Sequence, residues 1–423
     1  MNHSLSALLV SVSLFTSIGV AQSQSRNSLQ SKQNAHGPVA QINAKALLTA
    51  SNGTPKADFG MTSIAVNSTG NIIVVGAPLQ NSFSGGVYVY ARPATGWANA
   101  TETAQLIVPG LLKGSELGYA VAISSDGNTI VASSPQAGTG DSTIYVFSPT
   151  GGSWSNGGTI LAELTTSDVG AFMRSLAISS NGQTIVAGAQ FGPNYEGAVY
   201  VYSKPASGWT NMTQTAKLTV AAPHLFQALG YSVAIDGNTI AAGAADNQGG
   251  SPGPGGVYVY QKPASGWADG TETAALLASD GQRSDMLGFS IGISANTIVA
   301  GAPQHQGGVL YVFVKPTSGW ANAVQNAELT SASAGTLGQS IAVSGSLIIG
   351  GAPGTAIHPS GEVCVYAKPA TGWTNNTETY DLIAKADTPD GGLGWSASLT
   401  STGPVAIAGA DFENKGGVFV FGK

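Results

Sequence analysis

Short apolar segments with a period of two recur along the whole chain, and polar turns separate them. The most regular segments alternate aliphatic and aromatic residues, as in residues 87–90 (VYVY) and 257–260 (VYVY). Both faces of such a strand are apolar, so we expect each strand to be covered on both sides. No stretch shows the 3.6-residue period of an amphipathic helix. The pattern therefore predicts an all-β fold.

The strands belong to a unit that occurs seven times. Each unit opens with a small-aliphatic-small-aliphatic segment, and a second segment that ends in Gly-Ala or its equivalent follows 11 or 13 residues later. Separations that differ by two keep the same strand faces inward. Turns such as "DGN", "NGQ" and "SGS" suit tight hairpins. The opening segments begin at Ser63, Ala120, Ser175, Ser232, Ser290, Ser340 and Ser396. Four strands in each unit predict a seven-bladed β-propeller with four antiparallel strands per blade.

The seventh unit holds three strands, and a fourth has a counterpart at the other end of the chain. Residues 43–51 (NAKALLTAS) match residues 271–279 (TETAALLAS), and we place Leu47 in the key inward position. We expect the strand Ala44–Ala50 to pair with Val418–Phe421. This N-terminal strand would complete the last blade, close the ring and remove two open sheet edges.

The units resemble FG-GAP repeats, which build the N-terminal propeller of integrin α-chains and occur in many secreted proteins. The resemblance rests on "DFGMTSIAV…IIVVGAP", "LGYSVAI…TIAAGAA", "LGFSIGI…TIVAGAP" and "LGQSIAV…LIIGGAP" and covers about residues 42–423. It implies the propeller fold, but one fold carries many functions. Integrin-type repeats often hold a calcium loop between the opening segment and the Gly-Ala segment. Here each turn offers at most one carboxylate, as at Asp126 and Asp236, whereas calcium takes 6–8 oxygen ligands. We therefore expect turn-forming residues, no metal site and no cofactor.

The chain opens with an apolar run at Leu5–Val20, followed by small residues, which predicts a signal peptide at residues 1–21. The start Met1-Asn2-His3 departs from that pattern because it lacks Lys and Arg. Residues 22–41 are polar, and we expect a disordered spacer there. The propeller would then span residues 42–423. We expect no membrane span in the mature chain and a secreted or cell-surface protein.

Only 38 of the 423 residues are charged, 16 basic and 22 acidic, and the net charge is −6. The chain therefore lacks the basic stripe of a nucleic-acid-binding protein. A single cysteine, Cys364, excludes an intramolecular disulfide. It replaces Tyr or Phe in a core strand, so we expect it to be buried and inert. We also expect a monomer.

Six connections between third and fourth strands carry a tryptophan, and each either packs under its turn or forms a platform for sugars. A residue that is present in six blades favours the building role. These residues are Trp97, Trp154, Trp209, Trp267, Trp320 and Trp373. Trp395 lies on the first strand of the last unit, where we expect it in the core. No HExxH motif and no nucleophile elbow is present, which favours a non-catalytic protein.

The connections between second and third strands vary in length and content, as do those that lead to the next blade. In a propeller both sets emerge on one face, and variable loops on a constant scaffold are typical of a binding site. The candidate contacts are Phe191, Tyr195, Asp246, Asn247, His305 and His358, with ordinary surface loops as the alternative. We expect a secreted binding or adhesion module for a protein or glycan. The alternative is a secreted lyase or glycosidase that uses carboxylates on the same face. The sequence leaves open whether the sequons at Asn67, Asn99, Asn211 and Asn375 are glycosylated.

Overall fold

The computed structural model describes most of the predicted propeller. Its described residues are 39–54, 56–135, 142–191, 196–223, 227–245, 253–333, 335–354, 360–384, 391–401, 405–411 and 416–422. The predicted signal peptide and nearly all of the predicted spacer lie outside these residues. The segment Ala40–Lys423 forms one compact unit.

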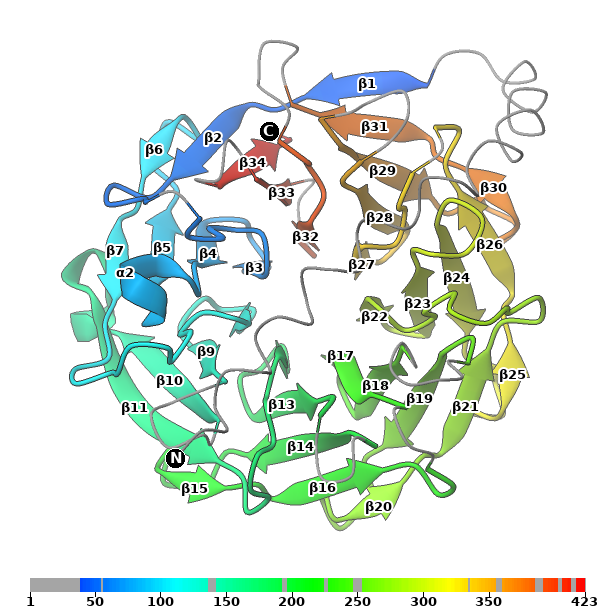
Figure 1. Ribbon diagram of the computed structural model, residues 1–423, viewed down its shortest axis with the longest axis horizontal. Helices are drawn as coiled ribbons and strands as arrows, with labels where there is room; N and C mark the ends of the chain where they lie inside the picture. The colour runs from blue at the N-terminus through cyan, green and yellow to red at the C-terminus, as the bar shows by residue number, and fades with distance from the viewer. Residues whose placement is uncertain are drawn as a thin grey trace, which may run out of the picture. The chain divides into compact units, whose positions relative to one another are not determined.

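Seven sheets stand around a central axis as the blades of a propeller, each with its first strand nearest the axis (Figure 1). Within every blade the four main strands pair antiparallel, in chain order in blades 1–6 and with the N-terminal β2 as the fourth strand of blade 7. The blades, from 1 to 7, are β3 (Ile64–Val66), β4 (Ile72–Gly76), β5 (Val87–Ala91) and β7 (Ala104–Leu106); β8 (Val121–Ile123), β9 (Ile130–Ser134), β10 (Thr143–Pro149) and β11 (Gly158–Thr165); β12 (Ser175–Ile178), β13 (Thr184–Ala189), β14 (Ala198–Ser203) and β16 (Ala216–Thr219); β17 (Leu229–Asp236), β18 (Thr239–Ala244), β19 (Gly256–Gln261) and β21 (Ala274–Leu277); β22 (Ile291–Ser294), β23 (Thr297–Ala302), β24 (Val309–Val314) and β26 (Ala327–Thr330); β27 (Ser340–Ser344), β28 (Leu347–Ala352), β29 (Glu362–Ala367) and β31 (Tyr380–Ile383); and β32 (Ser396–Leu399), β33 (Ala406–Ala410), β34 (Gly417–Phe421) and β2 (Ala46–Thr49).

A short fifth strand joins the outer edge of six blades, and it comes from a different part of the chain. In five cases the next blade supplies it in parallel, for example where Leu218 pairs with Gly270. These strands are β6 (Ala100–Thr101), β15 (Met212–Thr213), β20 (Gly270–Thr271), β25 (Ala323–Val324) and β30 (Asn376–Thr377). Blade 6 receives β1 (Ala40–Asn43) instead. Among the described residues the remaining short elements are α2 (Gln80–Phe83), η2 (Thr150–Gly152) and η3 (Trp154–Asn156).

The N-terminal segment closes the ring, as the repeat predicts. Strand β2 pairs antiparallel with β34, and β1 pairs parallel with β31 beside it (Figure 1). The inward residue is Leu48, which is fully buried and lies opposite Val418, whereas Leu47 is only partly buried. The prediction of Leu47 for this position was therefore wrong by one residue, and one residue in a strand changes the face. Strand β1 also begins at Ala40, ahead of the predicted boundary at residue 42.

At every regular blade boundary, the glycine of the Gly-Ala segment in one blade touches the glycine that shortly precedes the opening segment of the next blade. A Cβ atom on Gly76 would lie 1.9 Å from the carbonyl oxygen of Gly118 in the next blade, and Gly243 meets Gly288 in the same way at 2.0 Å. Blade 2 has Ser133 instead of this glycine, and the matching segment of blade 3, residues 171–178 (AFMRSLAI), has no glycine either. The two glycines that recur in the repeat thus contact each other across the boundary between neighbouring blades.

Seven apolar clusters fill the spaces between neighbouring blades among the described residues. Each of the six repeated tryptophans lies in such a cluster and is 5–7% exposed. The indole Nε1 of Trp97 donates to the carbonyl oxygen of Gly70, and that of Trp154 donates to Gly127, each in the first hairpin of its own blade. The six tryptophans therefore pack between the blades, which confirms the building role, and Trp97 and Trp154 also anchor the first hairpins of their blades.

Candidate binding site at the mouth of the central channel

The first strand of each blade begins at the axis, where a repeated serine fixes its direction. The Ser232 hydroxyl donates to the carbonyl oxygen of Gly288 at 2.8 Å, and Ser290 donates to Gly338 at 2.6 Å. Ser175, Ser340 and Ser396 make the same bond to the following blade. Because each serine is tied to the next blade, the residue before it is held at the channel.

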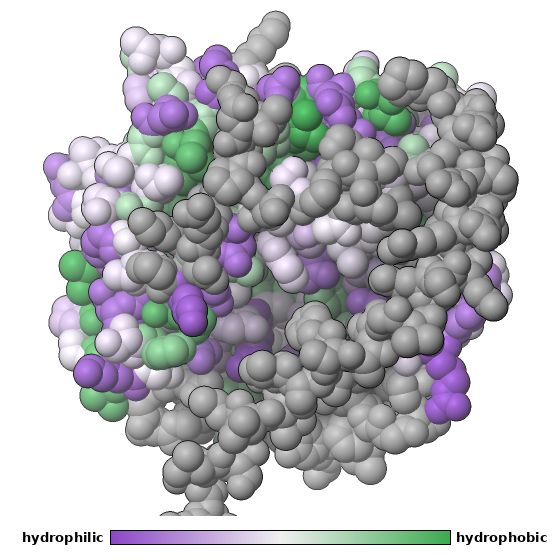
Figure 2. Space-filling view, turned by 45° about the horizontal axis from the view of Figure 1, so that its top comes forward, coloured by the Kyte–Doolittle hydropathy of each residue, from purple (hydrophilic) through white to green (hydrophobic). Residues whose placement is uncertain are grey.

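These residues surround a cavity of about 470 Å³ on the central axis. All seven blades contribute to its wall, and Figure 2 shows the surface hollowed near the centre of the view. The cavity is lined by residues 61–64, 119–120, 174–176, 231–233, 289–291, 339–341 and 395–397 and by Gln190. None of these residues is Asp, Glu, His or Cys. We call this cavity the channel mouth.

Four aromatic side chains and one arginine lie among the hydroxyl, amide and aliphatic groups that line the channel mouth. The rings of Tyr231 and Phe289 lie 4.8 Å apart between centroids, and the guanidinium carbon of Arg174 lies 4.8 Å from the centre of the Tyr119 ring. All four side chains are partly buried. Burial raises the pKa of the Tyr231 hydroxyl well above its usual value, so this group is a hydrogen-bond donor at neutral pH.

Trp395 lines the same cavity and is only partly buried. The prediction that it belongs to the core was therefore wrong. Its place in the unit equals that of Phe289 and Tyr231, directly before the repeated serine. The signal is in the sequence, because aromatic residues precede this serine in three blades.

The described ends of the variable connections lie near the channel mouth. Gln190, the first residue after β13, lines the cavity, and Phe191 follows it. Parallel bridges also join the described ends of five variable connections to the segments that enter the next blades, as between Gly197 and Leu229 or Gly255 and Leu287. These described ends therefore lie beside the segments that lead to the cavity.

Of the six predicted contacts, only Phe191 and His305 lie among the described residues, whereas Tyr195, Asp246, Asn247 and His358 lie outside them. Phe191 is partly buried beside the channel mouth. His305 is 3% exposed and lies elsewhere, beneath the connection between β21 and β22. The structure does not bring these two residues together in the cavity, and their binding roles stay predictions.

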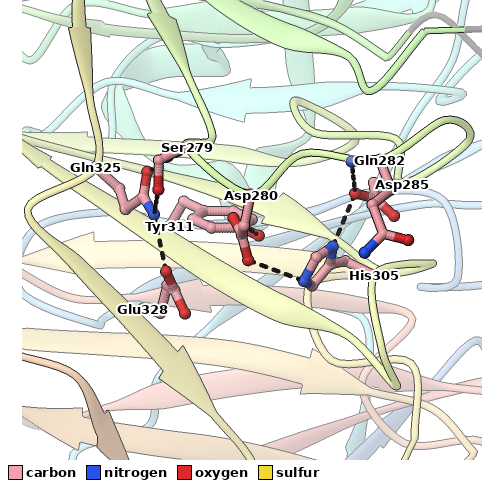
Figure 3. Close-up of polar contacts among 8 residues, drawn as sticks. All are labelled: Ser279, Asp280, Gln282, Asp285, His305, Tyr311, Gln325 and Glu328. Carbon is pink, nitrogen blue, oxygen red and sulfur yellow. Dashed lines mark hydrogen bonds and ion pairs between the residues drawn. The ribbon is translucent and has the colours of Figure 1, made fainter.

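His305 joins the connection between blades 4 and 5 to the loop between β23 and β24 of blade 5 (Figure 3). Its Nδ1 lies 2.7 Å from Oδ2 of Asp285, and its Nε2 lies 3.2 Å from Oδ2 of Asp280. The Tyr311 hydroxyl donates to the other oxygen of Asp280 at 2.9 Å, and the Gln282 amide donates to Asp285. His305 thus fixes the connection from blade 4 against the variable loop of blade 5.

A second group of charged residues lies where blades 7, 1 and 2 meet. Burial, together with the nearby carboxylates of Asp411 and Glu116, raises the pKa of Asp58 to about 6. Burial also raises the pKa of Glu116, while the Arg174 guanidinium lowers it. The charges of Asp411 and Glu116 thus act on Asp58, but none of these three carboxyls lines the channel mouth.

The two turn aspartates accept hydrogen bonds within the hairpin turns. Asp126 accepts from the Ser124 hydroxyl, from the amide of Asn128 and from its side chain. Burial by itself would raise the pKa of Asp126, but these bonds outweigh it and lower that pKa. Asp236 accepts from the Ala295 amide at 2.5 Å in the next blade. Asp126 therefore shapes its own turn, as predicted, whereas Asp236 joins two turns.

The sequons differ in what glycosylation would disturb. Asn67 is 2% exposed, and its side chain bonds the turn at Asn71 and Ile72. A glycan there conflicts with the folded structure. Asn99, Asn211 and Asn375 are exposed, although each accepts a hydrogen bond from the backbone of the preceding blade.

Residues 271–313 match the family model described as FG-GAP repeat. The match begins in β20 and runs through the fourth strand of blade 4 and three strands of blade 5. The protein is thus a seven-bladed β-propeller that carries an FG-GAP repeat, and the shared glycine contacts relate its other blades to that one. No curated protein matches the chain.

Proposed function

We propose that this protein is an extracellular, non-catalytic binding module and that its ligand binds at the channel mouth. The observation that carries the proposal is a cavity of about 470 Å³ lined by four aromatic side chains, one arginine and no carboxylate. Hydroxyl and amide side chains complete the lining, and a concave site with placed polar groups is a usual location for a ligand. The loops that border it offer further contacts.

Of the two expected ligand classes, the side chains of the channel mouth favour a glycan. The rings of Tyr119, Tyr231, Phe289 and Trp395 present flat apolar surfaces, against which the apolar faces of sugar rings pack. Hydroxyl and amide groups from Tyr231 and Gln339 supply hydrogen bonds at the rim, and Arg174 offers a cation to an acidic sugar. A protein ligand would contact the loops more than the cavity.

A glycan array probed with the purified protein tests this proposal. We expect a set of related glycans to bind, and we expect a soluble oligosaccharide of that set to compete. An array without signal, together with capture of an extracellular protein through the loops, would replace the glycan proposal by the protein one.

A polysaccharide-active enzyme is the second candidate, and one observation favours it. Asp58, whose pKa is about 6, has two further carboxyls near it, as paired acid and base groups do in glycosidases. This candidate requires that the protein degrade a polysaccharide and that Asp58→Asn abolish the activity. Release of reducing ends or of unsaturated products from polysaccharides by the wild-type protein would decide for it.

The extracellular location in the proposal is supported by the N-terminal apolar run, and adhesion is a role that such a location permits. In the part of the chain that the structure describes, no helix has both the length and the apolar character of a membrane span. Secretion with cleavage near residue 21 is tested by the N-terminal sequence of the protein recovered from culture medium.

A further inference from the structure

Blade 6 departs from the other blades at three neighbouring positions of its third and fourth strands. Cys364 takes the place of the Tyr or Phe that the third strand has elsewhere, and Glu362 takes a place held by small or apolar residues such as Gly256 and Val309. Residues two apart in a strand share a face, so both side chains point to the same side. Asp381 lies directly opposite Cys364 on β31.

These three side chains form a buried cluster. One ligand atom from each, a carboxylate oxygen of Glu362, Sγ of Cys364 and a carboxylate oxygen of Asp381, lies within 4.8 Å of the other two. Glu362 and Cys364 are fully buried, and Asp381 is 4% exposed. The cluster is therefore screened from solvent. An acidic group without a partner is costly in such a buried place.

The neighbouring acid Glu378 has a separate explanation. Both of its oxygens accept from the Ala332 amide, at 2.9 and 3.0 Å. The same bond recurs in other blades, where Glu102 accepts from Ser51 and Glu272 from Ala221. Glu378 is thus a repeated contact between blades, whereas the other three residues serve no repeated contact.

Asp381 points to a ligand because its Oδ1 is fully buried and has no hydrogen-bond partner. Most buried oxygen atoms of this kind are paired, and an unpaired one needs an explanation. Glu362 is oriented by the hydroxyls of Ser333 and Ser331, which donate to Oε1. The cluster thus combines an oriented carboxylate, a thiol and an unpaired carboxylate oxygen.

We propose that Glu362, Cys364 and Asp381 form a binding site for a divalent transition-metal ion, with Zn²⁺ as the preferred occupant. In a tetrahedral zinc site with bonds of about 2.0–2.3 Å, the ligand atoms lie about 3.5 Å apart. Metal binding would bring the three ligand atoms from within 4.8 Å of one another to that separation. A thiolate among the ligands selects zinc over calcium and magnesium, which take oxygen ligands only. The Cys364 thiol loses its proton to solvent when the metal binds.

This site is separate from the channel mouth and from the turns of the first hairpins. It lies inside blade 6, between β29 and β31, and its residues do not line the cavity. A metal there would cross-link the third and fourth strands beside β1, which stabilises the region where the ring closes.

Cobalt titration of the metal-free, full-length protein tests the proposal. We expect one Co²⁺ per chain and a thiolate-to-cobalt charge-transfer band in the near ultraviolet, which Zn²⁺ abolishes. Zn²⁺ should also raise the Tm, whereas Ca²⁺ should leave it unchanged. A wild-type protein without the charge-transfer band overturns the proposal, whatever the variants do.

Two variants and one matched control assign the ligands. Cys364→Ser should lose the charge-transfer band, and Asp381→Asn should weaken Co²⁺ binding at least tenfold. Glu328→Gln changes the equivalent position of blade 5, opposite Tyr311, and should bind like the wild type. A band that persists in Cys364→Ser, or equal weakening in Glu328→Gln, would also overturn the assignment.

Discussion

Gly409 of the last blade and Gly60 of the first are in such close contact that a Cβ atom on Gly409 would lie 1.9 Å from the carbonyl oxygen of Gly60. No Cβ atom fits at that distance, so the boundary requires glycine. The Ser396 hydroxyl donates to the same carbonyl oxygen. The ring therefore closes through a backbone contact that every regular boundary repeats, in addition to the strand β2.

Replacement of Gly409 by alanine should destabilise the protein by at least about 2 kcal/mol, because the blades must move apart to admit the methyl group. Gly354→Ala is the control, since a Cβ atom there meets nothing within 4 Å. Urea unfolding of the two variants checks the expectation. Equal stabilities would show that the boundary is looser than described.

Leu48 should stabilise the closed ring more than Leu47 does. Leu48→Ala removes a fully buried side chain and should cost about 2–4 kcal/mol, whereas Leu47→Ala should cost clearly less. Deletion of residues 22–51 removes β1 and β2 and should leave an exposed sheet edge, a lower Tm and aggregation. A deletion variant with the Tm of the wild type would contradict the closure by β2.

His305→Ala should lower stability by about 2–3 kcal/mol, because it leaves the Asp280 and Asp285 carboxylates in one place without the imidazole between them. Tyr311→Phe removes a single hydrogen bond to Asp280 and should cost about 1 kcal/mol. Denaturant midpoints of both variants give the comparison. A smaller loss in His305→Ala than in Tyr311→Phe would mean that His305 does not hold these loops.

Asp58 should make stability fall as pH rises from about 4 to about 6. Its folded pKa of about 6 lies above the ordinary value of 3.8, so the folded state retains a proton that the unfolded state loses in that window. Because Asp58 is partly exposed, we expect an effect of about 1–2 kcal/mol. Asp58→Asn should flatten this part of the curve. An unchanged slope in unfolding experiments between pH 4 and 7 would exclude a raised pKa.

The sequence predicts the propeller because each blade repeats the same strand pattern. A strand that is ambiguous in one unit can therefore be assigned from the other six. The channel mouth escaped prediction because its side chains come from seven blades and meet only in the folded ring. Trp395 shows the limit: read within its own strand it is a core residue, and only its alignment with Phe289 and Tyr231 reveals its place. The Glu362, Cys364 and Asp381 cluster likewise depends on strand register, which a single sequence does not supply.

The affinity of the best glycan for the Trp395→Ala variant tests the proposed binding site most directly. Trp395 lines the channel mouth, and Tyr380, an exposed aromatic residue on the outer strand β31, is the matched control. Calorimetry should show at least tenfold weaker binding to Trp395→Ala and unchanged binding to Tyr380→Ala, because only the first removes a ring that packs against the ligand. Equal Kd values for Trp395→Ala and the wild-type protein would contradict binding at the channel mouth.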